Sequence, residues 1–285
     1  MGDLFGRGLS LGELFGVRIR LHWTMLLIGL LAFTRGFDPL IALMLLILFL
    51  TVLIHELGHC FAARGVGGKA DEVLLWPLGG LAFTSGTTRT PGTFVWVALA
   101  GPLTHLPLAL LMAGLLAWFG HPVTLADLNP LAGDNYPKSA LLHNVVYFAF
   151  RLQVLLFCLN MLPAYPLDGG QVLFGLLARR LDLPHLGLLC AGLGLLCAAG
   201  LYVSGTLLFI PLLLAIESVR LGLDARSGAL EHSHLAELYR GPRLATPAPA
   251  RTESELVPCP RCGQGIHPRA ELCVHCDARL VERTP

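Results

Sequence analysis

The chain has 285 residues, of which 54% are hydrophobic and only 14% are charged, and its formal net charge is +1. Ordinary globular proteins contain about 25% charged residues, because a surface in water needs charge to stay solvated. The composition therefore excludes an ordinary soluble enzyme, a disordered protein and a basic nucleic-acid-binding protein, so nucleic acid is not an expected partner.

Apolar stretches long enough to cross a lipid bilayer follow one another along most of the chain. No cleavable signal peptide is expected, because residues 1–20 lack a continuous apolar stretch. Six membrane-spanning helices are predicted, at residues 21–34, 39–62, 93–119, 140–162, 184–203 and 207–221. The predicted fold class is therefore mainly α, a polytopic membrane protein whose first partner is the lipid bilayer.

Lysine and arginine are distributed unevenly between the predicted loops, and cytoplasmic loops carry an excess of both. An N-terminus in the cytoplasm places these cations on the cytoplasmic side: Arg7, Arg18, Arg20, Arg64, Lys69, Arg89, Arg179, Arg180, Arg220 and Arg226. The loops on the opposite side carry only Arg35 and Lys138. We expect a multi-pass protein of the cell membrane, a bacterial plasma membrane, with both termini in the cytoplasm.

The second predicted span contains the sequence His55-Glu56-Leu57-Gly58-His59. Two histidines four residues apart lie on one face of a helix, so both imidazoles can bind one metal ion. Glu56 is placed to accept a proton from a metal-bound water, whose pKa zinc lowers to about 7. Ionisable residues inside an apolar helix are costly in lipid, which favours a functional site over a chance match.

A catalytic zinc ion needs a third protein ligand and an open fourth position. Asp168 is the candidate, because it follows Pro163 and Pro166, which end the fourth predicted span, and precedes a short helix predicted over residues 169–180. Irregular backbone at membrane depth is tolerated where it lines a polar cavity or packs within protein. An ordinary helix N-cap is the alternative role for Asp168.

These two motifs together resemble the site-2 protease family of intramembrane zinc metalloproteases. The second motif is Asn-x-x-Pro-x-x-Pro-Leu-Asp-Gly-Gly, from Asn160 to Gly170, more than a hundred residues after the first. Six spans without an inserted PDZ domain are similar to the sporulation-protease branch, and the resemblance covers about residues 15–221. It implies that His55, His59 and Asp168 bind the catalytic Zn²⁺ and that Glu56 is the general base.

The same resemblance implies that the substrate is a transmembrane segment of another protein. It further implies that Asn160 positions the substrate or the catalytic loop, for which a hydrogen bond capping the broken helix is the alternative. The family places a membrane-associated β-hairpin where residues 71–84 favour short strands around Pro77, Gly79 and Gly80. An edge strand there could hold the substrate extended by strand addition, so Gly79 and Gly80 are candidate substrate-binding residues. The alternative is a plain cytoplasmic hairpin.

The stretch from Gly101 to His105 resembles the family's Gly-Pro-x-x-Asn motif, with a histidine in place of the asparagine. The resemblance implies that His105 contacts the substrate or stabilises the oxyanion, because a neutral histidine can still donate one hydrogen bond. A fourth metal ligand and a packed polar residue are the two alternatives for this position.

The hydropathy falls after residue 221, and residues 222–256 read as a polar linker containing Gly-Pro and Thr-Pro-Ala-Pro. Two Cys-x-x-Cys pairs follow, at Cys259, Cys262, Cys273 and Cys276. They predict a small zinc-ribbon module over residues 257–285, whose four thiolates bind a structural Zn²⁺ that the module needs in order to fold. Two disulfides are the alternative, which a cytoplasmic tail disfavours. A regulatory protein could bind this module, although a solvated structural module is the simpler interpretation.

The sequence therefore predicts an intramembrane metalloprotease domain over residues 1–221, which cleaves transmembrane segments in regulated intramembrane proteolysis. One alternative is a non-proteolytic metal-binding membrane protein, a transporter or a scaffold. A transporter would be expected to have polar residues on both sides of the ion, whereas the candidate ligands cluster near one face. The other alternative is a membrane metalloprotease of a different class, whose third ligand is a downstream helical glutamate.

Overall fold

The computed structural model describes residues 8–25, 34, 36, 38–77, 79–85, 90–129, 141–205, 209–239, 257–258 and 265–266. The chain divides into two units, Met1–Gly241 and Pro242–Pro285. In the described part of the second unit, β5 (Val257–Pro258) pairs antiparallel with β6 (Gly265–Ile266). The cysteines predicted to bind the structural zinc ion lie outside the described residues, so that prediction is not tested.

The first unit contains four helical stretches that are long and apolar enough to cross a membrane, at Pro39–Gly65, Pro91–Trp118, Leu141–Asn160 and Leu183–Val203. They correspond to the second to fifth predicted spans. The first predicted span lies mostly outside the described residues, and its opening residues belong to a strand. The sixth corresponds to α9 (Phe209–Ser227), which carries two acidic and two basic residues and is not one of these four helices. Of the six predicted spans, four are therefore found in the described chain.

Helix α3 (Pro39–Gly65) carries the two histidines and Glu56, and local signals define both of its ends. The Asp38 side chain accepts a hydrogen bond from the backbone N–H of Leu40 at 2.8 Å, and Pro39 occupies the first turn. At the other end, the N–H of Val66 donates to the carbonyl of Ala62, and Gly67 then adopts a positive φ of 78°. The helix therefore continues three residues beyond the predicted span.

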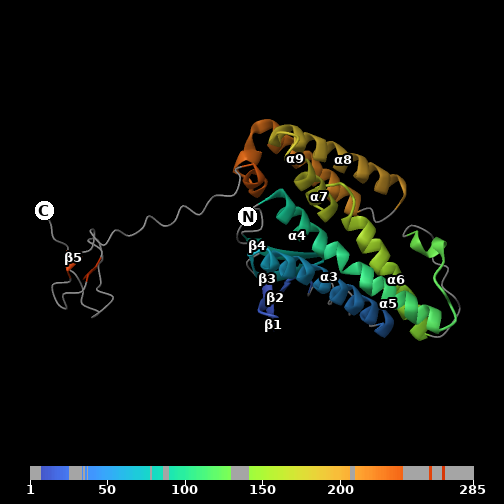
Figure 1. Cartoon of the computed structure of the whole chain (residues 1–285). Coiled ribbons are helices and arrows are strands. Elements are labelled where there is room, and N and C mark those ends of the chain that lie inside the picture. The colour runs from blue at the N-terminus through green and yellow to red at the C-terminus, as the bar shows by residue number, and fades with distance from the viewer. Residues whose placement is uncertain are drawn as a thin grey trace. The chain divides into compact units, whose positions relative to one another are not determined.

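The third predicted span is two helices, α4 (Pro91–Leu103) and α5 (His105–Trp118), which meet at Thr104 (Figure 1). The Thr104 hydroxyl and backbone N–H both donate to the carbonyl of Gly101, at 2.7 and 3.0 Å. Pro107 has no N–H to continue the hydrogen-bond ladder back to Leu103. These local features break the helix and make His105 the first residue of α5.

Four strands form one sheet in the order β1 (Gly8–Leu14), β2 (Val17–His22), β3 (Lys69–Trp76) and β4 (Gly79–Ser85). The β3–β4 pair confirms the hairpin predicted in this segment, whereas β1 and β2 were not predicted. Strands β1 and β2 are antiparallel, and the turn between them has positive φ at both Phe15 and Gly16, 52° and 74°. Such a turn matches the twist of the strands. Strand β2 runs parallel to β3, and β4 is an edge strand.

Arg64 joins the end of α3 to this sheet. Its guanidinium donates hydrogen bonds of 2.6 Å to the carbonyl oxygens of Phe15, Gly16 and Ala70. Leu57, Cys60 and Ala63 of α3 are buried in one apolar cluster with Val17 and Val73 of the sheet. Hydrogen bonds and apolar packing therefore hold against the sheet the C-terminal half of α3, which contains the metal-binding motif.

Helix α6 (Leu141–Asn160) is followed by an irregular segment and then by α7 (Asp168–Leu177), which confirms the short helix predicted there. A Cβ atom at Gly169 would collide with the carbonyl groups of Met161 and Leu162, and one at Gly170 with the backbone of Ala164 and Tyr165. Only glycine permits this close approach of the helix start to the preceding backbone. The Asp-Gly-Gly sequence thus seats the start of α7 against the segment that follows α6.

Residues 222–239, predicted as the beginning of a linker, instead complete α9 and form two short 3₁₀ helices, η2 (Ala229–His232) and η3 (His234–Leu238). Leu230 and Leu235 are buried in one cluster with Leu186 and Cys190 of α8 (Leu183–Val203). The apolar residues of this mostly polar segment therefore have a packing role. In the described chain, the folded part of the first unit reaches Tyr239.

Candidate metal centre

Three buried side chains from α3 and α7 converge at one point. The Nε2 atoms of His55 and His59 lie 3.1 Å apart, one on each of two successive turns of α3. Asp168 places Oδ2 at 3.1 Å from His55 Nε2 and Oδ1 at 3.3 Å from His59 Nε2. In the described part of the chain, these residues are the one group of three that could hold a metal ion. Two imidazoles and a carboxylate are ligands that zinc accepts.

Gly101 of α4 leaves room for an ion between these ligand atoms. A Cβ atom at this position would collide with the His59 ring at Nε2 and would lie 2.8 Å from His55 Nε2. The absence of a side chain here opens the side of the ring nitrogens that α4 would otherwise cover. The donor set and the space beside it therefore fit a bound metal ion.

Asp168 reaches the histidines because it is the first residue of α7 and not its cap. Leu167 occupies the N-cap position and makes no side-chain capping bond. The Asp168 carboxylate is turned toward the two imidazoles, away from the helix backbone. The alternative role of Asp168 as an N-cap is therefore not what the structure shows.

Glu56 lies next to the first histidine and against strand β4. Its side chain is buried and lies close to the backbone of Ala82. A Cβ atom at Gly80 would collide with the Glu56 side chain, and Gly79 has a φ of 144°, which other residues rarely adopt. Of the two glycines predicted to bind substrate, Gly80 is found where the backbone must pass close to Glu56, whereas a Cβ atom at Gly79 would meet nothing within 4 Å.

Each histidine also has a partner at its second ring nitrogen. His59 Nδ1 donates to the carbonyl oxygen of Val97 in α4 at 2.7 Å. His55 Nδ1 lies 3.1 Å from Nε2 of His105, whose Nδ1 lies 2.7 Å from Oε1 of Gln153. Both nitrogens of His105 are thus occupied, and the ring lies at the edge of His55 away from Asp168. The structure does not offer His105 to an ion at the centre as a fourth ligand.

Gln153 was not among the predicted site residues, and neither were Gly101, Thr51 and the Val97 carbonyl. Gln153 Nε2 donates to the Thr51 hydroxyl at 3.0 Å, and both side chains are buried. A buried amide within an apolar span is an unusual feature, and it is the signal by which Gln153 could have been found. Asn160, the last residue of α6, is partly buried, and its predicted role stays a prediction.

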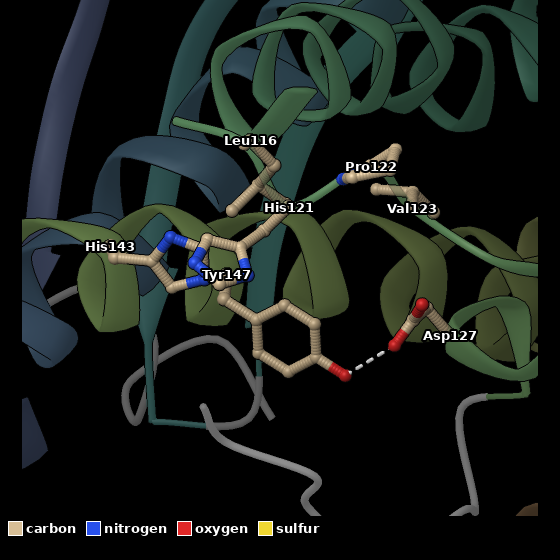
Figure 2. A pocket seen from close by; sticks show the side chains of 8 residues that line it. Leu116, His121, Pro122, Val123, Asp127, His143 and Tyr147 are labelled. Carbon is tan, nitrogen blue, oxygen red and sulfur yellow. Dashed lines mark hydrogen bonds between the residues drawn. The ribbon is translucent and has the colours of Figure 1, made fainter. Parts of the chain in front are cut away.

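A separate pocket lies where α5 ends and α6 begins (Figure 2). Tyr147 donates a 2.6 Å hydrogen bond to Asp127 in η1 (Leu125–Leu128), and Arg151 donates to the carbonyl oxygens of Asp127 and Asn129. Partial burial raises the pKa of the Asp127 carboxyl, but hydrogen bonds from Thr124 and Tyr147 outweigh it and lower that pKa below its ordinary value. The network fastens η1 to α6, and it accounts for Arg151 within an apolar helix.

The chain matches the model of Peptidase family M50 over residues 43–186, about half of its length and a range that includes all the residues of the metal centre. A chain with this motif-bearing helix and this ligand set is a metallopeptidase by class, and it belongs to Peptidase family M50.

Several relatives support this membership. The chain is 32% identical over 187 residues to Rip3 of Mycobacterium tuberculosis, which covers 60% of this chain and 44% of the relative. It is 26% identical over 247 residues to the zinc metalloprotease MJ0392 of Methanocaldococcus jannaschii, covering 85% of this chain and 67% of the relative. It is 34% identical over 139 residues to stage IV sporulation protein FB of Bacillus subtilis, covering 48% and 41%. The chain thus spans less than half the length of two of these three relatives.

Among solved structures, the chain is similar to the site-2 protease from Methanocaldococcus jannaschii. The TM-score is 0.49 and the sequence identity 23%, over 78% of this chain and 94% of the solved one.

Proposed function

We propose that the chain is an intramembrane zinc metalloprotease that cleaves transmembrane segments of other membrane proteins. The observation that carries the proposal is the convergence of His55, His59 and Asp168 beside Glu56, on a helix long and apolar enough to cross a membrane. Membership of Peptidase family M50 supports hydrolysis of a peptide bond as the reaction.

The proposed roles follow from the positions of the side chains. His55, His59 and Asp168 would hold the ion, which when bound supplies Lewis-acid activation of a water molecule and of the scissile carbonyl. Glu56 accepts the proton of the attacking water on its carboxylate and then donates it to the leaving amide nitrogen. Because Glu56 adjoins His55 on the same helix, its carboxylate stays beside the reacting atoms throughout both steps.

The free edge of β4 offers a way to hold the substrate. A transmembrane helix hides its peptide bonds, so it must become extended before hydrolysis. In the described sheet β4 is an edge strand, and Gly80 and Ala82 of this strand lie beside Glu56. A substrate strand added along this edge would lie beside the general base. This arrangement supports a substrate-binding role for Gly79 and Gly80. We propose that the hairpin that contains them is associated with the membrane.

We further propose the membrane arrangement and the role of the C-terminal unit. His55 and His59 lie in the last three turns of α3, which the excess of cations in the neighbouring loops would place toward the cytoplasm. Both termini would then be cytoplasmic, in the plasma membrane of a bacterium. The four cysteines between 259 and 276 would hold a structural zinc ion in a ribbon module, which a regulatory protein could bind.

Replacement of Glu56 by Gln tests the proposed reaction. The amide keeps the shape of the side chain but cannot accept the proton, so we expect cleavage to fall at least about 10²-fold while zinc stays bound. The measurements are zinc content of the purified protein and cleavage of single-span membrane proteins produced in the same cells. Asp168→Ala is the matched comparison, because it should lose zinc as well as activity. Retained cleavage by Glu56→Gln would contradict the proposed mechanism.

A further inference from the structure

We propose that His105, Gln153 and Thr51 form a relay that sets the tautomer of His55, so that the lone pair of His55 Nε2 points at the metal ion. In this proposal His105 is a positioning residue and makes no contact with substrate. The inference rests on the zinc site proposed above, and it concerns side chains on the opposite edge of the His55 ring from that site.

A neutral imidazole binds a metal ion through the nitrogen that carries no proton, so its other nitrogen must carry one and needs an acceptor. For His59 the acceptor is the carbonyl oxygen of Val97, which can only accept. For His55 the partner is Nε2 of His105, 3.1 Å away. Because a histidine nitrogen can either donate or accept, His105 alone does not decide which nitrogen of His55 carries the proton.

The amide of Gln153 determines which nitrogen of His105 carries the proton. Its Oε1 atom can only accept, and it lies 2.7 Å from His105 Nδ1, so that nitrogen carries the His105 proton. His105 Nε2 is then an acceptor for the proton on His55 Nδ1, which leaves His55 Nε2 free to bind metal. If the Gln153 amide were rotated by 180°, it would donate to His105 Nδ1, and His105 Nε2 would then donate to His55 Nδ1. The proton of His55 would in that case lie on Nε2, the metal-binding nitrogen. In the structure the amide has the productive orientation, in which Gln153 Nε2 donates to the Thr51 hydroxyl over 3.0 Å.

The relay joins three helices and is closed to water. Thr51 and His55 lie one turn apart on α3, His105 begins α5, and Gln153 lies in the middle of α6. Thr51, His105 and Gln153 are 3%, 1% and 4% exposed. Water cannot replace a partner in such a buried network, and a buried polar group left unpaired would destabilise the protein. With a metal ion on His55 Nε2, the pattern described above is the one that leaves every polar group of the network paired.

The experiment uses the full chain in detergent and measures zinc affinity by competition with a chelator. Gln153→Met keeps the length of the side chain but removes both hydrogen bonds, and we expect zinc affinity to fall about 10–100-fold, as for other residues that orient metal ligands. Gln153→Glu keeps an oxygen facing His105 Nδ1 and should stay close to the wild-type affinity. His143→Gln, a buried histidine of α6 outside the relay, is the control and should also match the wild type.

Two further readouts separate positioning from packing and from substrate contact. With Co²⁺ in place of zinc, the visible absorption spectrum should change in Gln153→Met and His105→Leu and stay unchanged in His143→Gln. If His105 instead contacts substrate, His105→Leu would raise KM for cleavage with zinc affinity and the cobalt spectrum unaltered, which would overturn the proposal.

Equal zinc affinity in Gln153→Met and the wild type would overturn the relay, and so would equal losses in Gln153→Met and Gln153→Glu. A wild-type chain that binds no zinc would overturn the metal site itself and this inference with it. Zinc bound normally by a chain that cleaves no membrane protein would contradict the proposed function but leave the relay standing.

Discussion

At the residue scale, the metal centre depends on a missing side chain as well as on three ligands. Gly101 lies on α4, on the side of the ring nitrogens of His55 and His59 where an added Cβ would collide with His59 Nε2. The imidazoles cannot move away freely, because His59 is tied to Val97 and His55 to His105 at their other nitrogens. The space between the ligands is thus maintained by their neighbours.

Gly101→Ala should therefore lower zinc affinity strongly without unfolding the protein. Alanine favours a helix over glycine by about 1 kcal/mol, so the helix itself is stabilised by the change. Zinc content after dialysis and the thermal unfolding temperature without metal are the two measurements. Gly114→Ala in α5, where an added Cβ meets nothing within 4 Å, is the matched control and should bind zinc normally. Normal zinc binding by Gly101→Ala would contradict this account of the site.

Sequence reasoning singled out His55, Glu56 and His59 because their residue types and spacing are unusual in an apolar helix, and it singled out Asp168 chiefly by family resemblance; the structure brings the two histidines and Asp168 together. It noted Gly101 only as part of a motif and gave it no role, and it missed Gln153, because the roles of both depend on contacts between α3, α4 and α6. It placed His105 in the site by resemblance but predicted a contact with substrate. Whether a histidine side chain faces the reacting atoms or the far edge of a metal-binding imidazole depends on the tertiary structure.

At the element scale, the largest difference concerns β1 and β2. Residues 17–22 alternate apolar and polar side chains, which is the pattern of a half-buried strand. The prediction instead began a membrane span at residue 21, because hydropathy rises there and β3, the partner of β2, lies about 50 residues further along the chain. The β3–β4 hairpin was predictable because its two strands are adjacent in sequence.

The packing of α8 on α9 provides a prediction at the same scale. A Cβ atom at Gly194 would collide with the Ser218 side chain, whereas one at Gly192 would meet nothing within 4 Å. Gly194→Val should force the two helices apart and lower the free energy of unfolding by about 1–3 kcal/mol. Gly192→Val introduces the same side chain into the same helix and should cost much less.

Thermal unfolding of the two valine variants in the same detergent is the direct comparison. Loss of stability in both to the same extent would point to the helix propensity of valine, and would contradict close packing at Gly194 as the cause.

At the scale of the whole molecule, the chain has two units that we expect to bind zinc by different chemistry. The first unit offers two imidazoles and a carboxylate around an ion. The second contains the four cysteines of the predicted ribbon, where thiolates would enclose the ion completely. Cysteine spacing predicts the second site from sequence alone, since short metal-binding modules are defined by local contacts.

The full chain should accordingly bind two zinc ions, and the double variant Cys273→Ser, Cys276→Ser should bind one. Because the first unit has its own ligands, the variant should keep the ion that Asp168 holds. Elemental analysis of both proteins gives the ratio of zinc to protein, and adding Asp168→Ala to the cysteine variant should remove the last ion. Two ions in the cysteine variant would contradict a structural site in the second unit.

The hydrogen bonds of the Arg64 guanidinium have a consequence for where a substrate would be cut. They tie α3, which carries His55, Glu56 and His59, to the sheet at the turn between β1 and β2 and at the start of β3. If a substrate pairs with the edge of β4 as proposed, the distance from that edge to the scissile bond would be fixed. The position of the cleaved peptide bond would then depend on its distance from the point at which the substrate helix unwinds. The side chains on either side of the cleaved bond would matter much less.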